Sequence, residues 1–162
     1  MLSDCHNVCL TNLVILGAQG SYHGVVICKG SDVLIENCRV ETATGSSISS
    51  AVRVKDCVEG KCSTLTARNC EIRDTQKKGA EVSGMGIANV YRCNFSDSYG
   101  SNVAVKGGGV LELHECECND SRKEVGVYVT GQGSYAQARA TSFSSKWSKN
   151  IWVHEDVAVE LW

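Results

Sequence analysis

Short segments in which apolar and polar residues alternate recur from one end of the chain to the other. A short segment such as 25–27 is followed by a polar turn and then by a longer alternating segment such as 32–40. Alternation places successive side chains on opposite faces of a β-strand, so each segment is expected to bury one face. The segments are rich in Val, Ile, Thr and Cys and lack the sustained spacing of an amphipathic helix. The pattern therefore predicts an all-β protein.

The alternating segments are copies of one template. In the longer segment, one column of equivalent positions steps by 25, 32, 23, 23 and 25 residues and contains Leu13, Cys38, Cys70, Cys93, Cys116 and Thr141. A second column, two residues further on, keeps these steps and contains Ile15, Val40, Ile72, Phe95, Cys118 and Phe143. The short segment repeats as Val25/Ile27, Val52/Val54, Ala80/Val82, Val103/Val105, Val127/Val129 and Ile151/Val153. Regular repeats of this length are typical of solenoids.

The repeat predicts a single-stranded right-handed parallel β-helix, a solenoid of about six to seven rungs. An immunoglobulin-like sandwich also has alternating strands, but it does not require equivalent columns at a fixed step. We expect one domain over residues 1–162, as a fragment or subunit of a larger assembly. The additional residues of the 32-residue step fall in 56–63, so residues 56–62 are expected to project as a loop.

Composition narrows the classes of partner. The chain has 162 residues, of which 43% are hydrophobic, enough for one sizeable core. Its 16 Lys and Arg against 18 Asp and Glu give a formal net charge of −2, which supplies no basic field for nucleic acid. No window approaches the roughly 20 apolar residues of a membrane span, and no basic-then-apolar leader is present. We expect a soluble protein with neither a nucleic-acid nor a membrane partner.

The ten cysteines are spread along the chain, with no CxxC pair and no Cys/His cluster at zinc spacing. We therefore expect no metal site. The column of Cys38, Cys70, Cys93 and Cys116 is expected to stack inside the solenoid as small, reduced, buried side chains. Reduced thiols indicate an intracellular, cytoplasmic protein.

The rung from Gly24 to Val40 resembles the repeats of the pectin-lyase-like superfamily, in particular its carbohydrate-binding and sugar-hydrolase (CASH) type domains, and the resemblance extends over residues 6–162. That superfamily contains lyases, glycosidases, epimerases and non-enzymatic recognition domains, so the resemblance implies the fold more than the function. The Asn-Thr-Asp, Asp-Asp, Gly-His-Gly and Arg-Ile-Lys set of polygalacturonases is missing. We expect a non-enzymatic binding or scaffolding module. A polysaccharide lyase or glycoside hydrolase and an architectural subunit of a large complex are the alternatives.

A row of carboxylates follows the cysteine column. Asp74, Asp97 and Asp120 each lie four residues after a column cysteine and step by 23. Stacked carboxylates about 5 Å apart have the separation found in retaining glycosidases, and the resemblance to pectate lyases also permits a Ca²⁺ site. Asp after a strand is equally typical of a turn, and no basic residue recurs beside these three. We expect stacked turn residues, with no cofactor and no Ca²⁺.

The outward positions of the short segment supply the candidate binding surface. One row contains Val26, Arg53, Glu81, Ala104, Tyr128 and Trp152, and the next contains Cys28, Lys55, Ser83, Lys106, Thr130 and His154. Aromatic side chains on a flat sheet can stack on sugar rings or anchor a protein, and neighbouring cations can bind a carboxylate. The predicted binding residues are Arg53, Lys55, Lys106, Tyr128 and Trp152, although a solvated strand face is an alternative for the three cations.

The last alternating segment, 157–162, carries no polar cap. An uncovered strand edge can pair with another chain. We therefore expect a protein partner or self-association through open solenoid ends near Trp152 and Trp162, with carbohydrate as a further possible ligand.

Overall fold

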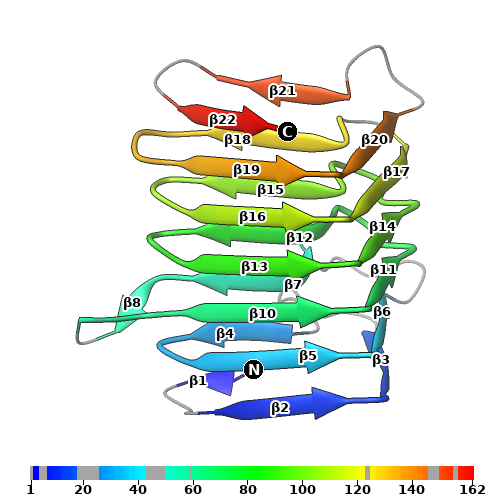
Figure 1. Cartoon of the computed structure of the whole chain (residues 1–162). Helices are drawn as coiled ribbons and strands as arrows, with labels where there is room; N and C mark the ends of the chain where they lie inside the picture. The colour runs from blue at the N-terminus through cyan, green and yellow to red at the C-terminus, as the bar shows by residue number, and fades with distance from the viewer. Residues whose placement is uncertain are drawn as a thin grey trace.

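The chain folds into a stack of β-strands wound into coils, as Figure 1 shows. This computed structural model describes residues 2–3, 7–17, 26–42, 50–58, 60–122, 125–145, 150–154 and 157–162. Apart from the two short strands of a hairpin described below, the strands of one coil pair in parallel with the equivalent strands of the next coil. No helix is found in the described ranges. The all-β solenoid prediction is therefore confirmed.

Three parallel sheets run the length of the solenoid. Sheet A contains seven strands, which are β1 (Leu2–Ser3), β4 (Val26–Lys29), β7 (Ser50–Lys55), β12 (Lys78–Ser83), β15 (Val103–Lys106), β18 (Val127–Thr130) and β21 (Ile151–Val153). Sheet B contains seven, which are β2 (Val8–Thr11), β5 (Asp32–Glu36), β10 (Thr64–Arg68), β13 (Ile87–Tyr91), β16 (Val110–His114), β19 (Tyr135–Arg139) and β22 (Ala158–Leu161). Sheet C contains six, which are β3 (Val14–Gly17), β6 (Arg39–Thr42), β11 (Glu71–Arg73), β14 (Asn94–Ser96), β17 (Glu117–Ser121) and β20 (Ser142–Ser145). The strand numbers agree with the six to seven rungs predicted.

The longer predicted segment is two strands, not one. Its first half belongs to sheet B and its second half to sheet C, with a sharp corner between them. One residue at each corner adopts a left-handed conformation with φ between 49° and 56°, at Asn12, Asn37, Asn69, Arg92, Glu115 and Ala140. Asn tolerates this conformation better than most residues, which explains its presence at three corners. Single-strand alternation was the wrong prediction for this part of the rung.

Inward side chains stack in register and form one continuous apolar core. Val40, Ile72, Phe95 and Cys118 follow one another in adjacent strands of sheet C, as the second predicted column requires. Phe95 is 1% exposed and is among the largest fully buried side chains. Burying one large apolar side chain contributes about 1.5–3 kcal/mol, so repeated rungs add stability along the whole stack.

The cysteine column lies at the corner between sheets B and C. Cys38, Cys70, Cys93 and Cys116 are buried and free. Each thiol donates to the carbonyl two residues earlier, with sulfur–oxygen distances of 3.1–3.4 Å, and Thr141 makes the same bond to Arg139 at 3.0 Å. Burial raises the pKa of the Cys116 thiol. The prediction of buried, unpaired thiols is confirmed for these four residues, whose hydrogen bonds satisfy corner carbonyls.

One strand of sheet A is shifted by a residue from the predicted register. Val26 pairs with Val52, and Cys28 pairs with Val54, whose side chain is buried in the core. Cys28 is fully buried, and burial raises the pKa of its thiol to about 12. Lys29 takes the outward place beside Lys55 that was assigned to Cys28. The error arose because Val, Ile and Cys occur at four consecutive positions, which hides the alternation.

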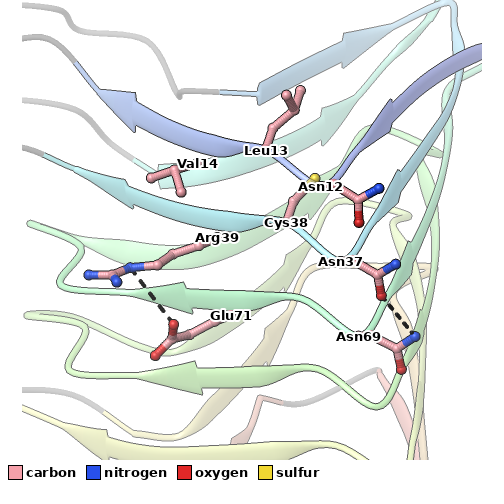
Figure 2. Close-up of a pocket in the computed structure, with 8 residues that line it drawn as sticks. All are labelled: Asn12, Leu13, Val14, Asn37, Cys38, Arg39, Asn69 and Glu71. Atoms are coloured by element: carbon pink, nitrogen blue, oxygen red, sulfur yellow. Dashed lines mark hydrogen bonds and ion pairs between the residues drawn. The ribbon is translucent and has the colours of Figure 1, made fainter.

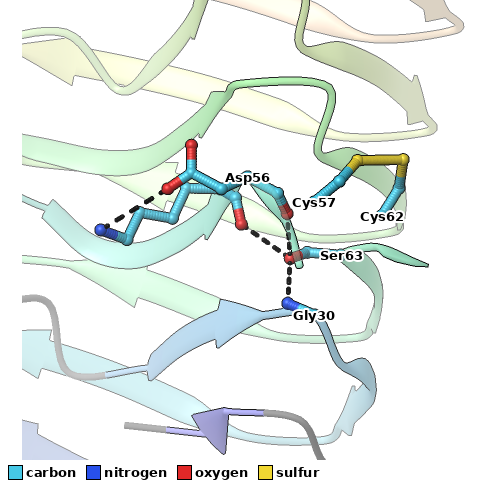
Figure 3. Close-up of a disulfide and its surroundings, with 6 residues drawn as sticks. Gly30, Asp56, Cys57, Cys62 and Ser63 are labelled. Atoms are coloured by element: carbon cyan, nitrogen blue, oxygen red, sulfur yellow. Dashed lines mark hydrogen bonds and ion pairs between the residues drawn. A yellow bond between two sulfur atoms is a disulfide. The ribbon is translucent and has the colours of Figure 1, made fainter. Parts of the chain in front are cut away.

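The segments 57–58 and 60–62 project from the third rung as a small hairpin (Figure 1), as the long step predicted. Strands β8 (Cys57–Val58) and β9 (Lys61–Cys62) are antiparallel, and Cys57 and Cys62 form a disulfide (Figure 3). At its base, the Ser63 hydroxyl lies 2.7 Å from the carbonyl oxygen of Lys55 and accepts from the Gly30 N–H at 2.8 Å. The expectation that the thiols are reduced is wrong for this pair. The intracellular location rested on that expectation and stays a prediction.

Candidate functional site

The predicted binding residues lie on the outward face of sheet A. Arg53, Glu81, Ala104, Tyr128 and Trp152 are paired in register on successive strands. With strands about 4.8 Å apart, this row extends about 19 Å along the solenoid. A second row begins with Lys29 and Lys55 and continues through Ser83 and Lys106 to Thr130. The structure therefore places all five predicted residues on one face.

A cluster of charges occupies the middle of this face. Glu81 is only 6% exposed and is contacted by three cations. Its carboxylate lies 3.0 Å from the Arg53 guanidinium, 2.6 Å from Lys78 Nζ and 3.9 Å from Lys106 Nζ. One carboxylate among three cations leaves an excess of positive charge on the face. We call Arg53, Lys78, Glu81 and Lys106 the charge cluster.

Glu81 stays ionised within the charge cluster. Burial opposes ionisation, but the hydrogen bond from Lys78 and the charges of Lys78, Arg53 and Lys106 together lower the pKa of this carboxyl. A carboxylate held ionised by three cations is poorly suited to donate a proton as a general acid. The arrangement instead resembles a fixed counter-charge that positions its cations. Arg53 Nε is buried and has no hydrogen-bond partner among the described residues, so the cluster retains a donor.

Two aromatic residues continue the row toward the C-terminal rung. The Tyr128 and Trp152 rings meet edge to face, with centroids 5.9 Å apart and an interplanar angle of 78°. Tyr128 is half-buried, whereas Trp152 is 48% exposed. Edge-to-face contact leaves ring surface available to a ligand, because the two rings do not cover each other. The charge cluster and this aromatic pair are separated by Ala104 alone, which is fully buried.

The outward face is less solvated than the sequence indicated. Glu81 and Ala104 are buried although they lie in an outward row. Lys78 was not among the predicted binding residues, because strict alternation places it on the inward face together with Ala80 and Val82. As the first residue of β12, however, it reaches Glu81. The useful signal was the acidic residue itself, since a lone Glu in a row of cations and aromatics requires a partner.

Lys55 lies apart from the charge cluster. Its Nζ is 3.9 Å from a carboxylate oxygen of Asp56, at the base of the hairpin (Figure 3). Both side chains are partly exposed, so this ion pair contributes little to stability. Lys55 therefore lies at the edge of the face, next to Asp56.

The row of Asp74, Asp97 and Asp120 belongs to a different part of the rung, in sheet C. Asp74 directly follows β11 and Asp97 directly follows β14, whereas Asp120 lies within β17, where the pairing with β20 changes register. All three residues adopt left-handed φ values, of 51°, 55° and 55°. Arg122 contacts Asp74 at 3.2 Å and Asp97 at 3.4 Å. No basic residue recurs along this row in the sequence. The single Arg122 guanidinium nevertheless bridges two rungs. The geometry is that of turn residues in which Asp relieves a left-handed position.

Two shallow hollows flank the corner between sheets B and C. The first, of about 440 Å³, has Asn12, Asn37 and Asn69 on one side and Val14, Arg39 and Glu71 on the other (Figure 2). Asn69 donates its side-chain amide to Asn37 at 3.3 Å. The second, of about 400 Å³, contains Tyr91 and His114, whose rings stack with centroids 5.0 Å apart, beside the Arg92–Glu115 pair. Neither hollow was predicted from the sequence. Each is lined by equal numbers of acidic residues and arginines.

The described ranges contain neither a cluster of metal-ligating side chains nor a membrane-spanning helix. No group of three or more His, Cys, Asp or Glu side chains is placed to hold a metal ion within them. Within the same part of the chain, no helix is long and apolar enough to cross a membrane.

Comparison with known proteins identifies the fold family. A family model described as a right-handed β-helix region matches residues 57–160. No curated protein and no solved structure matches the chain. The matched residues cover more than half of the chain and include strands of all three sheets. Together with the parallel register of those strands, this match shows that the chain belongs to the right-handed β-helix family.

Proposed function

We propose that this protein is a non-enzymatic binding module that recognises an acidic carbohydrate through the outward face of sheet A. The observation that carries the proposal is the charge cluster next to an aromatic pair whose outer member, Trp152, is exposed. Arg53, Lys78 and Lys106 outnumber the single carboxylate that they surround. An anionic group arriving at the face meets an excess of positive charge, and a sugar ring bound beside it meets Tyr128 and Trp152.

The charge cluster supports binding because its cations are held in place before a ligand arrives. Glu81 holds the cations in position, so fewer side-chain conformations have to be given up when a ligand binds. Lys106 is more exposed than the other two cations, with 37% of its side chain accessible, and is the first that a ligand would meet.

The geometry favours binding over catalysis. Glu81 is the described carboxylate at the centre of the face, and its lowered pKa keeps it charged. Asp74, Asp97 and Asp120 occupy left-handed positions at or near the ends of sheet C strands, outside the rows of sheet A. The resemblance of the rungs to pectin-lyase-like domains supports carbohydrate as the ligand class.

The proposal is tested by calorimetric titration with an oligosaccharide of uronic acids, its neutral counterpart and an acidic peptide of equal charge. We expect the uronic acid oligosaccharide to bind and the neutral one to bind at least tenfold more weakly, with affinity falling as salt rises. Lys106→Ala and Trp152→Ala should each weaken binding several-fold. Arg92→Gln is the matched control, because Arg92 is an exposed cation of sheet B's corner and should not affect binding.

Two outcomes would contradict the proposal. Equal binding of the acidic peptide would show that the face recognises charge rather than sugar. Failure of Lys106→Ala and Trp152→Ala to change a measured affinity would place the ligand elsewhere on the solenoid.

A further inference from the structure

The outward face of sheet C presents two parallel columns of side chains, because each of its strands turns two residues outward. The first column contains Val14, Arg39, Glu71, Asn94 and Glu117, in register on β3, β6, β11, β14 and β17. The second column, two residues further on, contains Leu16, Glu41, Arg73, Ser96 and Asn119. This face is distinct from the sheet A face of the proposed function.

The four charged residues of β6 and β11 form a checkerboard. Arg39 lies 2.9 Å from Glu41 on its own strand, and Arg73 lies 3.1 Å from Glu71. Contacts between the strands connect Arg73 to Glu41 at 3.3 Å and Arg39 to Glu71 at 3.8 Å, the latter drawn in Figure 2. The four side chains are 22–41% exposed, so they are ordered by each other yet still accessible.

The rung next to the checkerboard is apolar on the same face. Val14 and Leu16 are each 65% exposed, whereas Ile15 between them points toward the core. Exposure of two neighbouring aliphatic side chains beside fixed charges is a common composition for a protein contact.

We propose that the outward face of sheet C docks against a second copy of this chain through a two-fold axis parallel to the solenoid axis. Such an axis keeps each rung at its own height and exchanges the two columns. Every first-column residue then faces the second-column residue of the same rung in the other copy. The facing pairs are Val14 with Leu16, Arg39 with Glu41, Glu71 with Arg73, Asn94 with Ser96, and Glu117 with Asn119.

Each facing pair is chemically matched. The pairs are apolar with apolar, cation with anion, anion with cation, amide with hydroxyl, and carboxylate with amide. A two-fold contact requires such self-complementarity, since the same patch must serve both copies. An axis along the strands that crosses at β11 does not provide it, because Glu71 would then face Glu71 of the second copy. An axis along the strands midway between β6 and β11 would pair opposite charges but would place Val14 and Leu16 opposite Asn94 and Ser96. The register of the sheet therefore selects one orientation.

The contact is small. Five rungs about 4.8 Å apart and a width of about 13 Å give on the order of 300 Å² of face per copy, below the area of standard stable interfaces. We therefore expect a weak dimer, populated at protein concentrations on the order of 10⁻⁴ M. The sheet A face of each copy remains outside this contact, so the dimer would present two ligand faces.

Sedimentation equilibrium of the intact chain tests the proposal. Association should weaken several-fold as salt rises from about 0.05 to 0.5 M. Arg39→Glu places like charges opposite each other twice and should weaken association at least tenfold. Exchanging all four charges, as Arg39→Glu, Glu41→Arg, Glu71→Arg and Arg73→Glu together, keeps every pairing within and between copies and should restore association to within about threefold.

Arg92→Glu is the matched control, because Arg92 is 69% exposed at the corner outside this face. It should leave association unchanged, and thermal unfolding must show that every variant is folded. A chain that is monomeric at about 1 mM, or a dimer that is equally sensitive to Arg92→Glu and Arg39→Glu, would overturn the proposal.

Disulfide trapping tests the orientation. In a background with Cys5 and Cys9 changed to Ser, we would mix chains carrying Asn94→Cys with chains carrying Ser96→Cys. The mixed disulfide should form faster than either symmetric one, because these positions face each other across the axis. Equal rates for the three products would show that the copies do not meet in this register.

Discussion

Replacing Glu81 by Gln should destabilise the protein. The carboxylate is 6% exposed and contacts Arg53, Lys78 and Lys106. The neutral amide keeps the shape of the side chain but removes the one negative charge of the cluster. Three cations then lie close together without the carboxylate that separates and positions them.

The magnitude follows from the burial of the partners. Removing one member of a fully buried ion pair costs about 3–5 kcal/mol, but exposed pairs contribute only about 0–1 kcal/mol. Lys78 is 16% exposed, Arg53 27% and Lys106 37%, so this cluster lies between those limits. We expect Glu81→Gln to lower the free energy of unfolding by about 2–3 kcal/mol at pH 7, which lowers Tm by about 4–12 °C for a chain of this size.

The pH dependence provides an independent check. Since the pKa of Glu81 is lowered in the folded state, its stabilisation is complete above the ordinary value of 4.5 and is lost as pH falls through the folded pKa. Urea unfolding from pH 7 to pH 3 should therefore show a difference between wild type and Glu81→Gln that shrinks below about pH 4.5. A difference that is constant over this range, or a Gln variant as stable as wild type at pH 7, would refute the role assigned to the charge cluster.

Three further predictions concern the core, the turn carboxylates and the thiols. Phe95→Ala should lower the free energy of unfolding, measured by urea titration, by about 3–5 kcal/mol, because the ring is 1% exposed in the core. A decrease of less than about 1 kcal/mol would contradict that packing. Asp97→Gly should preserve stability, whereas Asp97→Ala should lower the free energy of unfolding by about 1–2 kcal/mol, because φ at this position is 55°. Millimolar Ca²⁺ should leave the Tm of the wild type unchanged. A Ca²⁺-dependent rise in Tm that Asp97→Ala removes would identify a metal site instead. Alkylation of the native protein should modify exposed Cys9 quickly, and mass spectrometry should find a slow, unpaired set at Cys38, Cys70, Cys93 and Cys116; any disulfide among these four would disprove the reduced column.

Much of the corner geometry was present in the sequence but was not recognised. Inward residues follow at intervals of two within a strand, as at Val33 and Ile35, and then at an interval of three before Cys38. The additional residue is the left-handed Asn37, which turns the chain from sheet B into sheet C. The same interval precedes Cys70, so the division into two strands could have been predicted from the spacing alone.

The sequence by itself determined the solenoid and its interior. Columns with a common step specify the fold because parallel, in-register stacking places equivalent residues on top of each other, and only small or apolar side chains fit inside. Column membership was therefore predictable for Cys93 and Phe95 from position alone.

The tertiary structure alone decided how polar side chains pair across rungs. Glu81 meets Arg53 and Lys106 because neighbouring strands bring long, flexible side chains together, and alternation specifies only the face on which each side chain begins. The Cys57–Cys62 disulfide likewise depends on the antiparallel register of a hairpin whose residues lie outside the repeat. Repetition constrains the backbone and the core, whereas ion pairs and cross-links depend on distances that no periodic pattern contains.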